Sequence, residues 1–517
     1  MYTQSMSQRR SIALLAIVTA AFAFAVIAAF GSGSAAAGAE ARAKGAVAVP
    51  ATALAYASVN ADRSGAPWQA LEALAAKVPG GDKAIAMLND QLNGSTEQAK
   101  LMQALGGDLS VGLLGIDLSG GTTPSADAVI VATAADSAAL TSELAKAGFT
   151  KGPDLNGAPV WERGAFAISI SGSTAIGATS RGTLQTALGV EAGTSPALAD
   201  DPAFQATLAK LPTDSIAVAY LAPARIAGLA QLATTLLPKS STKGMPDPTQ
   251  ALTQLSATLE DVHGLGLALH VESNGLRVVA AGDADEAALA KLGARIPTAY
   301  APTLTNQIPA DATGFVAFRD LGPSLLAVLN VAAAQSPEVA KQIVSLEKLT
   351  GISVRADLIP ALTGEHALVA LGGDTPSGAL LLAPQDPTAA ATTLTKALAS
   401  AKQLGAGRAE KGLTKSAIDA TKISVTVQPG GSVVAVGTAP QLAAAPNASI
   451  TSSTAYQAIT GQAGLPANVT GLAYINAAQL QKMAVAKGAK AVPAVGAING
   501  IVAWGTPGAA TLFISIG

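Results

Sequence analysis

The chain has 517 residues, half of them hydrophobic and 13% charged, with a formal net charge of −2 and no cysteine. This composition excludes global disorder, disulfides, thiolate metal sites, cysteine nucleophiles and a cysteine-linked lipid anchor. Nucleic-acid binding requires a basic stripe, whereas the 32 Lys and Arg residues are spread thinly along this sequence. A chain of this length is expected to form two or three domains.

The first predicted element is an apolar helix over Ile12–Phe30, preceded by Arg9 and Arg10. Such a helix would rise about 28 Å, close to the ~30 Å hydrocarbon core of a membrane. The two arginines would hold the N-terminus in the cytoplasm. Two interpretations stay open: an uncleaved membrane anchor, or a signal peptide cleaved near Ala35–Ala37. In both, residues 1–45 are expected to form a leader and a linker, and the rest of the chain is expected to lie outside the cytoplasm. An uncleaved segment would make the chain a single-pass protein of the cell membrane, and a cleaved one would make it a secreted protein.

The mature part of the sequence contains an internal similarity. Pro50–Tyr56 resembles Pro309–Phe315, and Leu211–Tyr220 resembles Leu465–Tyr474. Both matches lie about 250–260 residues apart, and the strand and helix patterns between them follow in the same order. We therefore expect two diverged copies of one unit, over residues 46–296 and 297–517, the second preceded by a proline-containing linker.

The local patterns favour an α+β fold with mainly antiparallel sheets. Short apolar strands are separated by tight turns such as Ser171–Ser173. Asp136 and Asp386 each follow a strand and are placed as helix N-caps, with helices expected over Ala138–Ala147 and Ala389–Ala401. Two separate, closely packed sheets are expected because each copy has its own closing strand pair. One sheet shared by both copies is the alternative.

Two stretches carry a family resemblance. Leu54–Asn60, Trp68–Leu71 and Ala76–Gly80 form the first, and Trp161–Ala167 with Thr174–Gly177 form the second. In these stretches the chain resembles the DUF3352 family, over most of its length from about residue 46. The resemblance implies an uncharacterised bacterial envelope protein, commonly with an N-terminal membrane segment. It implies no activity and no site residues.

The three histidines, His263, His270 and His366, do not predict a metal site. His263 and His270 flank one predicted strand at an odd spacing, which would direct them to opposite faces. His366 opens a strand of the other copy. We expect all three to be isolated histidines on the surface or at strand ends.

The sequence predicts no catalytic, cofactor-binding or metal-binding residues. Ser240–Lys243 and Ser345–Lys348 fit the Ser-x-x-Lys spacing, but the other elements of penicillin-recognising enzymes are missing. Asp200 and Asp201 are expected to cap a helix over Ala203–Leu211, and Asp283–Glu286 resembles a capping box. The prediction for Trp68, in a helix, and Trp161, in a strand, is packing in or beside the core.

Two classes of function follow from these observations. The leading hypothesis is a non-catalytic, membrane-tethered or secreted envelope protein that binds a partner protein or an apolar ligand such as a lipid. The alternative is a cell-envelope hydrolase with an unrecognised site. A pocket lined almost wholly by aliphatic side chains would favour the first, and one that collects several ionisable groups would favour the second.

Overall fold

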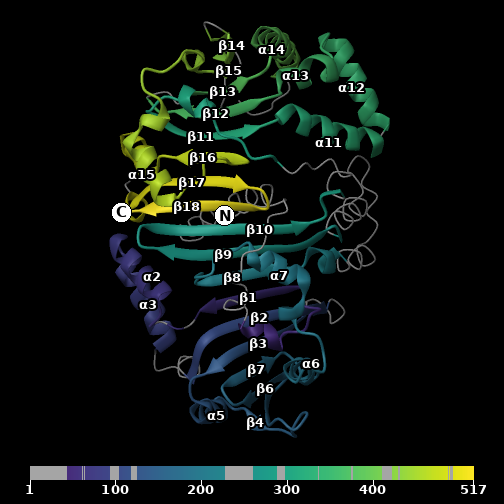
Figure 1. Ribbon diagram of the computed structural model, residues 1–517, viewed down its shortest axis with the longest axis vertical. Coiled ribbons are helices and arrows are strands. Elements are labelled where there is room, and N and C mark those ends of the chain that lie inside the picture. The colour runs from purple at the N-terminus through teal and green to yellow at the C-terminus, as the bar shows by residue number, and fades with distance from the viewer. Residues whose placement is uncertain are drawn as a thin grey trace. The chain divides into compact units, whose positions relative to one another are not determined.

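The computed structural model describes residues 44–60, 62, 64–93, 104–117, 125–227, 260–287, 297–335, 337–373, 377–409, 422–428, 431–486, 488 and 493–517 (Figure 1). The predicted apolar helix over Ile12–Phe30 lies outside these residues. Within them, no helix combines the length and the apolar character needed to span a membrane. The described residues form an α+β fold that divides into two compact units. Unit 1 ends at Asp285 and also includes Gly508–Thr511; unit 2 comprises the remaining residues from Glu286 onward.

The described residues of unit 1 form ten strands. The strands are β1 (Ala55–Asn60), β2 (Leu105–Asp117), β3 (Ser125–Ala134), β4 (Thr150–Lys151), β5 (Val160–Arg163), β6 (Phe166–Ser171), β7 (Thr174–Ala178), β8 (Ala217–Leu221), β9 (Val262–Glu272) and β10 (Gly275–Ala284). The helices are η2 (Lys44–Ala48), α2 (Ala66–Lys77), α3 (Gly81–Asn93), α5 (Ser137–Lys146), α6 (Arg181–Glu191), η3 (Leu198–Asp200) and α7 (Pro202–Ala209).

All strand pairs of unit 1 are antiparallel, in the order β4-β5-β6-β7-β3-β2-β1-β8-β9-β10. The predicted turn between β6 and β7 is confirmed, with Gly172 at φ 59°. Asp136 caps α5, and Asp201 caps α7 by accepting a hydrogen bond from the Phe204 N–H. The predicted capping box at Asp283–Glu286 is wrong, because Asp283 belongs to β10 and pairs with Gly264.

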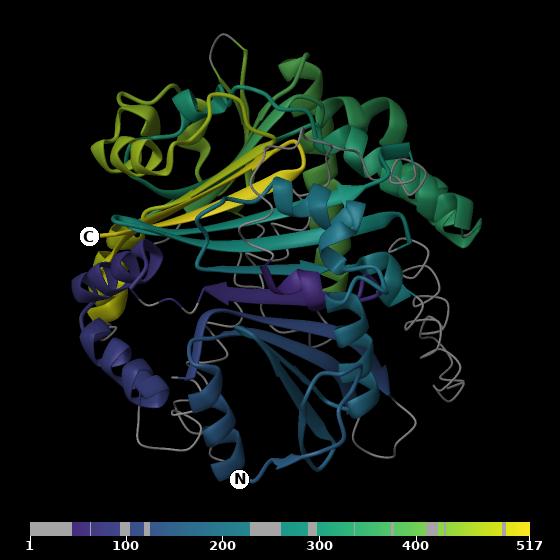
Figure 2. The ribbon, with the colours of Figure 1, turned by 60° about the horizontal axis from the view of Figure 1, so that its bottom comes forward.

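The sheet of unit 1 has two apolar faces, because side chains alternate along each strand. One, the core face, carries Tyr56, Val131, Ile176 and Val218 and packs against η2, α6 and α7. The other, the groove face, is covered by α5 at the β3–β6–β7 end through a small cluster around Leu140. Figure 2 shows α5 and α6 on opposite sides of these strands.

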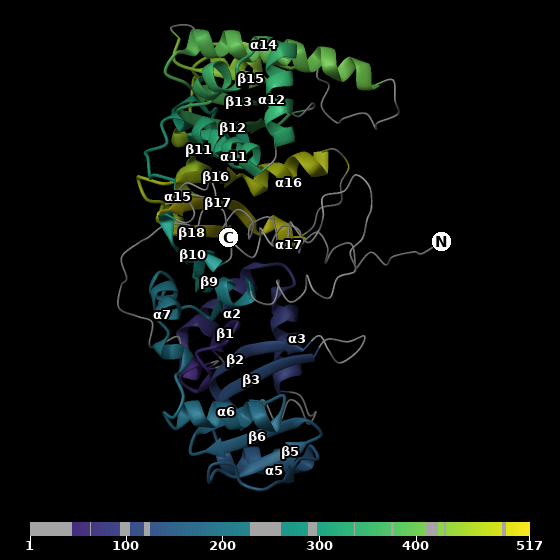
Figure 3. The same ribbon diagram turned by 90° about the vertical axis from the view of Figure 1, so that its right-hand side faces the viewer.

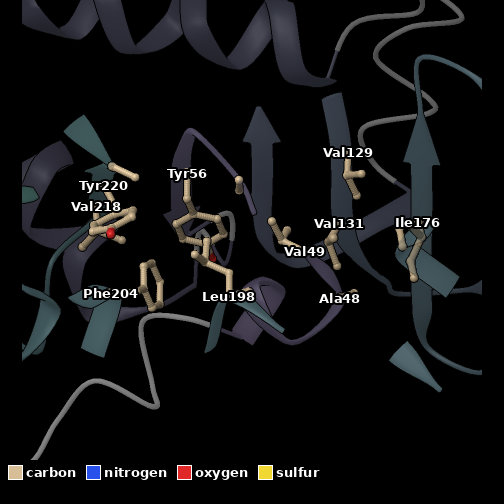
Figure 4. Close-up of a cluster of buried hydrophobic side chains, with 14 of the residues drawn as sticks. Ala48, Val49, Tyr56, Val129, Val131, Ile176, Leu198, Phe204, Val218 and Tyr220 are labelled. Atoms are coloured by element: carbon tan, nitrogen blue, oxygen red, sulfur yellow. The ribbon is translucent and has the colours of Figure 1, made fainter. Parts of the chain in front are cut away.

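Aromatic side chains form the centre of the core face (Figure 4). The Phe204 ring of α7 stands edge-on to Tyr56 of β1 at 5.5 Å and to Tyr220 of β8 at 5.0 Å. Such edge-to-face pairs add roughly 0.5–1.5 kcal/mol each beyond their burial. The chain before β1 is fixed against η3, where Leu198 N donates to the Val49 carbonyl at 2.8 Å.

Eight strands lie in the part of unit 2 that the structure describes. They are β11 (Ala312–Arg319), β12 (Glu365–Leu371), β13 (Ser377–Ala383), β14 (Ser424–Val427), β15 (Val434–Gly437), β16 (Gly471–Ile475), β17 (Ile498–Thr506) and β18 (Ala509–Ile516). The helices are η4 (Leu304–Gln307), α11 (Leu321–Gln335), α12 (Pro337–Thr350), η5 (Val354–Leu358), α13 (Ile359–Ala361), α14 (Pro387–Ala409), η7 (Pro440–Ala443), η8 (Ile450–Ser452), α15 (Thr454–Ala463), α16 (Ala477–Ala486) and α17 (Pro493–Gly496).

Pairing in unit 2 is antiparallel in the order β14-β15-β13-β12-β11-β16-β17. β18 follows β17, with Gly517 N donating to the Ala497 carbonyl at 3.1 Å. α15 and α16 lie on opposite sides of this sheet, and α11 and α14 lie beside its other end (Figure 3). Asp386 caps α14 as predicted, accepting a hydrogen bond from Ala389 N at 2.9 Å.

A buried carboxylate fixes the start of unit 2. Glu365 on β12 is 8% exposed and accepts hydrogen bonds from Thr303 N, Thr303 Oγ1 and Leu304 N. These bonds satisfy amide groups at the start of η4 that have no partner within the helix. Glu365 therefore holds the proline-containing segment against the sheet.

We predict that Gly45→Ala destabilises the fold, because a Cβ at Gly45 would lie 2.3 Å from Ser110 Oγ. Overpacking of this kind costs roughly 1–3 kcal/mol. Gly461→Ala is the matched control: no atom lies within 4 Å of its added Cβ, and an alanine inside a helix stabilises by roughly 0.5–1 kcal/mol. Urea unfolding measures both changes. Equal stabilities of the two variants would contradict the close contact of η2 with β2.

Candidate functional site

A groove of about 350 Å³ lies on the groove face of unit 1, over β2, β1, β8, β9 and β10. Side chains that are directly opposite on neighbouring strands form rows across this face. The strand registers define two such rows. The first comprises Val111, Ala57, Ala219, Leu267 and Ala280, and the second comprises Leu113, Ala55, Leu221, Leu265 and Gly282.

The residues in these rows leave space in the middle of the groove and make its lining apolar throughout. Ala55, Ala57 and Ala219 are small and leave the space open, whereas the larger leucines stand around them. None of the described residues that line the groove carries a charge. Val111 is 38% exposed, which is unusual for a large aliphatic side chain in the middle of a sheet. The groove therefore offers water an apolar surface that a ligand could cover.

Two tyrosines belong to the groove lining but keep their hydroxyl groups on the other side of the sheet. Tyr56 Oη lies 3.0 Å from Ser110 Oγ, and Tyr220 Oη donates to the His263 carbonyl at 3.3 Å. Burial raises the pKa of Tyr220 to about 12 and also raises the pKa of Tyr56. Both phenols stay protonated at physiological pH, so they add no charge to the groove.

The groove is elongated across the strands. Five strands at a spacing of about 4.8 Å span roughly 19 Å, and two rows two residues apart span about 7 Å along the strands. α5 packs on the same face at one end. At the other, α2 contacts β9, and its Trp68 Nε1 donates to the Asn60 carbonyl at 2.6 Å. The space suits a narrow, extended, apolar molecule.

The family model described as "Protein of unknown function (DUF3352)" matches residues 161–498. The chain belongs to the DUF3352 family. A comparison with curated proteins finds no match. Two solved structures that match part of this DUF3352 protein are "Structure of crystal form I of TP0453" and "Structure of crystal form IV of TP0453". Their identities are 11% and 9% and their TM-scores 0.25 and 0.24; each match covers 46% of this chain, and 77% and 79% of the other. Likeness at this level supports no inference about fold or function.

Two histidines of the DUF3352 protein lie apart from each other and from the groove lining. His263 and His270 are near opposite ends of β9, with Nδ1 atoms 3.6 Å from Asp283 Oδ2 and 3.3 Å from Asp214 Oδ1, respectively. Within the described residues, no group of three or more histidine and acidic side chains is arranged to hold a metal ion. Trp68 lies in α2 and Trp161 in β5, as predicted.

The Ser-x-x-Lys candidates do not form a site in the described structure. Ser345 lies on α12 and donates its hydroxyl proton to the Lys341 carbonyl at 2.8 Å, so the hydroxyl is bonded within its own helix. Ser240–Lys243 lies outside the described residues.

The groove was not predicted from the sequence, although the alternation of small and large apolar residues in β1 and β8 marks both faces of these strands as apolar.

His366 differs from the expected surface histidine, because it is fully buried. Its ring stacks on Phe318 at 5.3 Å, and neither ring nitrogen has a hydrogen-bond partner in the described structure. Burial lowers the pKa of His366 to about 4, and the Asp320 carboxylate and the Gly364 carbonyl raise it by less. The ring is therefore neutral at physiological pH and acts as a core side chain.

We predict that His366 makes unit 2 sensitive to acid. Between pH 6.5 and about 4, the unfolded chain binds a proton at this residue and the folded chain does not, so the free energy of unfolding falls as the pH falls. Over this whole pH range the free energy of unfolding falls by about 3 kcal/mol. His366→Phe keeps a ring on Phe318 and removes this loss. Hydrogen exchange of the β12 amides, measured at pH 7 and pH 4.5 with correction for intrinsic exchange, should show the difference. An equal loss of protection in both proteins would contradict it.

Proposed function

We propose that the protein binds the hydrocarbon chain of a lipid in the groove of unit 1. The observation that carries this proposal is the lining: aliphatic side chains and the apolar parts of two tyrosines, with no charge among the described lining residues. Burial of apolar surface stabilises a complex by roughly 25 cal/mol per Å². A ligand with charged or strongly polar groups along its length would lose hydration here without gaining partners.

The dimensions of the groove favour a lipid chain over a protein partner. Its length of roughly 19 Å exceeds the ~15 Å that one acyl chain spans in half of a ~30 Å hydrocarbon core. Its volume of about 350 Å³ lies in the range of small-molecule sites, roughly 300–1,000 Å³. A stable protein interface needs about 800 Å² on each partner, and the groove is concave and narrow.

The sequence supports a setting in which lipids are available. The apolar segment Ile12–Phe30 with its flanking arginines is the basis for proposing that residues 46–517 are extracytoplasmic, tethered to the membrane or secreted. Under this proposal the protein is a non-catalytic binding module of the bacterial cell envelope.

We also propose that the two units are diverged copies. Seven neighbouring strands of unit 1 lie in the order β6-β7-β3-β2-β1-β8-β9, and seven of unit 2 lie in the order β14-β15-β13-β12-β11-β16-β17. When the strands are ranked by their position along the chain, the two orders are the same. The Tyr56–Phe204–Tyr220 cluster has its counterpart in Phe315, Tyr456 and Tyr474. The bridge between Pro50 and Ala197 has its counterpart between Pro309 and Ser449.

The groove can be tested by photolabelling the full chain in membranes with a fatty acid that carries a diazirine. Labelled peptides are expected from β1, β2, β8 and β9. Ala57→Glu places an unpaired carboxylate in the groove and should reduce this labelling about tenfold or more. Ala57→Leu keeps the surface apolar and is the matched control. Ala57 is exposed, so neither variant should affect folding. Labelling of the four strands that is unchanged by Ala57→Glu, or absent from the natural protein, would exclude the proposed site.

A reporter fusion tests the location. A fluorescent protein that matures only in the cytoplasm, fused after Gly517, should give no signal when expressed with the full chain. The same reporter fused to a chain that starts at Lys44 should fluoresce, because the apolar segment is then missing. Bright fluorescence from the full-length fusion would refute the extracytoplasmic placement.

A further inference from the structure

Two short helices of unit 2, α16 and α17, expose apolar side chains. α16 lies on the side of the sheet opposite α15 and contacts α17 (Figure 3). Leu480 and Val485 of α16 are 42% and 45% exposed, and Val495 of α17 is 41% exposed. No described residue of either helix is buried. A group of exposed apolar side chains costs free energy in water until another apolar surface covers it.

One side of α16 is attached to the rest of unit 2. Gln479 Nε2 donates to the Asp311 carbonyl at 2.9 Å, and Met483 lies against Gly372, where an added Cβ would be 2.6 Å from Met483 Sδ. Gln479 and Met483 are four residues apart and are therefore neighbours on the surface of the helix. Asp311, the acidic residue in these contacts, is thus on the attached side. Because successive residues of a helix are turned by about 100°, the opposite side of α16 points away from these contacts.

The outward side of α16 is apolar. It carries Leu480, Ala484 and Val485, which are all exposed. α17 packs beside it, since a Cβ at Gly496 would lie 3.1 Å from Gln481 Nε2, and the exposed valine of α17 is the residue before Gly496. These side chains form one surface, called the α16–α17 surface, which consists of Leu480, Ala484, Val485 and Val495.

The charges that the sequence places beside this surface are positive. Lys482 is exposed and lies three residues before Val485, so the two are neighbours on α16. Lys487 and Lys490 stand in the sequence between α16 and α17. From Ala420 to Gly517 the sequence contains no aspartate and no glutamate. This part of the chain therefore combines exposed apolar side chains with lysines and supplies no carboxylate side chain to neutralise them.

The size and the charge of this surface favour a bilayer over a protein partner. Its side chains cover much less than the roughly 800 Å² per partner that a stable protein interface needs. A symmetric contact with a second copy of the chain would bring the same patch, with its lysines, against itself, and like charges repel. An anionic bilayer instead accepts apolar side chains at the boundary between headgroups and acyl chains, and its phosphates attract lysines.

We propose that the α16–α17 surface docks on a bilayer that contains anionic phospholipid. α16 would lie on the membrane without crossing it, with Leu480 and Val485 at the boundary between headgroups and acyl chains. The apolar stem of Lys482 would extend along this boundary and carry its ammonium group to a phosphate. This contact is separate from the proposed anchor at Ile12–Phe30 and from the groove of unit 1, so it depends on neither.

Because the chain has no cysteine, a single introduced cysteine can carry the label that tests this docking. The full chain with Val485→Cys is labelled with a fluorophore and mixed with vesicles of phosphatidylcholine and phosphatidylglycerol, in which some lipid carries a nitroxide on its acyl chain. The nitroxide should quench the fluorophore. Lys482→Glu should weaken docking at least fivefold, which is about the effect of losing one lysine at an anionic surface. Lys482→Arg keeps the charge and is the matched control.

Leu349→Cys is the control for the position of the label. Leu349 of α12 is apolar and 67% exposed but lies outside the α16–α17 surface, so its label should not be quenched. Val495→Cys takes the place of Val485→Cys if circular dichroism shows that the latter does not fold. Ala57→Glu, which tests the groove, should leave the quenching unchanged, so the two proposals can fail separately.

Four results would overturn the proposal. The first is no quenching of a label on α16 or α17, and the second is equal quenching of a label at Leu349. The third is equal docking of the Lys482→Glu and Lys482→Arg variants. The fourth is shielding of the α16 label that appears without vesicles and grows with protein concentration, which would assign the surface to a second copy of the chain.

Discussion

Alternation of side chains along β-strands means that every sheet presents two surfaces, and the arrangement of this molecule depends on how each surface is covered. In unit 1 both surfaces are apolar. The core face is covered by η2, α6 and α7, with Phe204 wedged between Tyr56 and Tyr220. On the groove face, α5 covers one end of the sheet, and among the described residues the middle, around Ala57, Ala219 and Val111, forms the lining of the apolar groove. An apolar surface of this kind costs free energy in water until something covers it.

The two faces also separate two kinds of chemistry. The groove suits hydrocarbon because strand register aligns aliphatic residues from five strands. The core face is built by residues of opposite parity on the same strands, and it buries the Ser58 hydroxyl 3.0 Å from Ser110 Oγ. Consecutive residues of β1 therefore lie in different surroundings. One side chain lines the apolar groove, and the next lies among buried hydroxyl groups. Unit 2 has the same strand order without these hydroxyl groups, since Ala317 pairs with Ala367 where unit 1 pairs Ser58 with Ser110.

Local patterns predicted the features that depend on a few neighbouring residues. The caps at Asp136, Asp201 and Asp386 and the turn at Gly172 were predictable because each acts within three or four residues. The capping box at Asp283 was wrong because pairing with Gly264 holds that residue in β10. The position of the groove could not be predicted from the sequence, since β1 and β8 are neighbours in the sheet but lie far apart in the chain. The prediction that His366 lies at the surface was wrong, because the burial of this residue depends on stacking against Phe318 of another strand.

The most direct test of lipid binding in the groove is native mass spectrometry of the full chain, extracted from the membrane of its own host. The account predicts a bound species with the mass of an acyl-chain lipid, one per chain, that is absent when Ala219→Trp fills the centre of the groove. Protein that carries no such mass, or a lipid that stays bound to the Ala219→Trp variant, would contradict it.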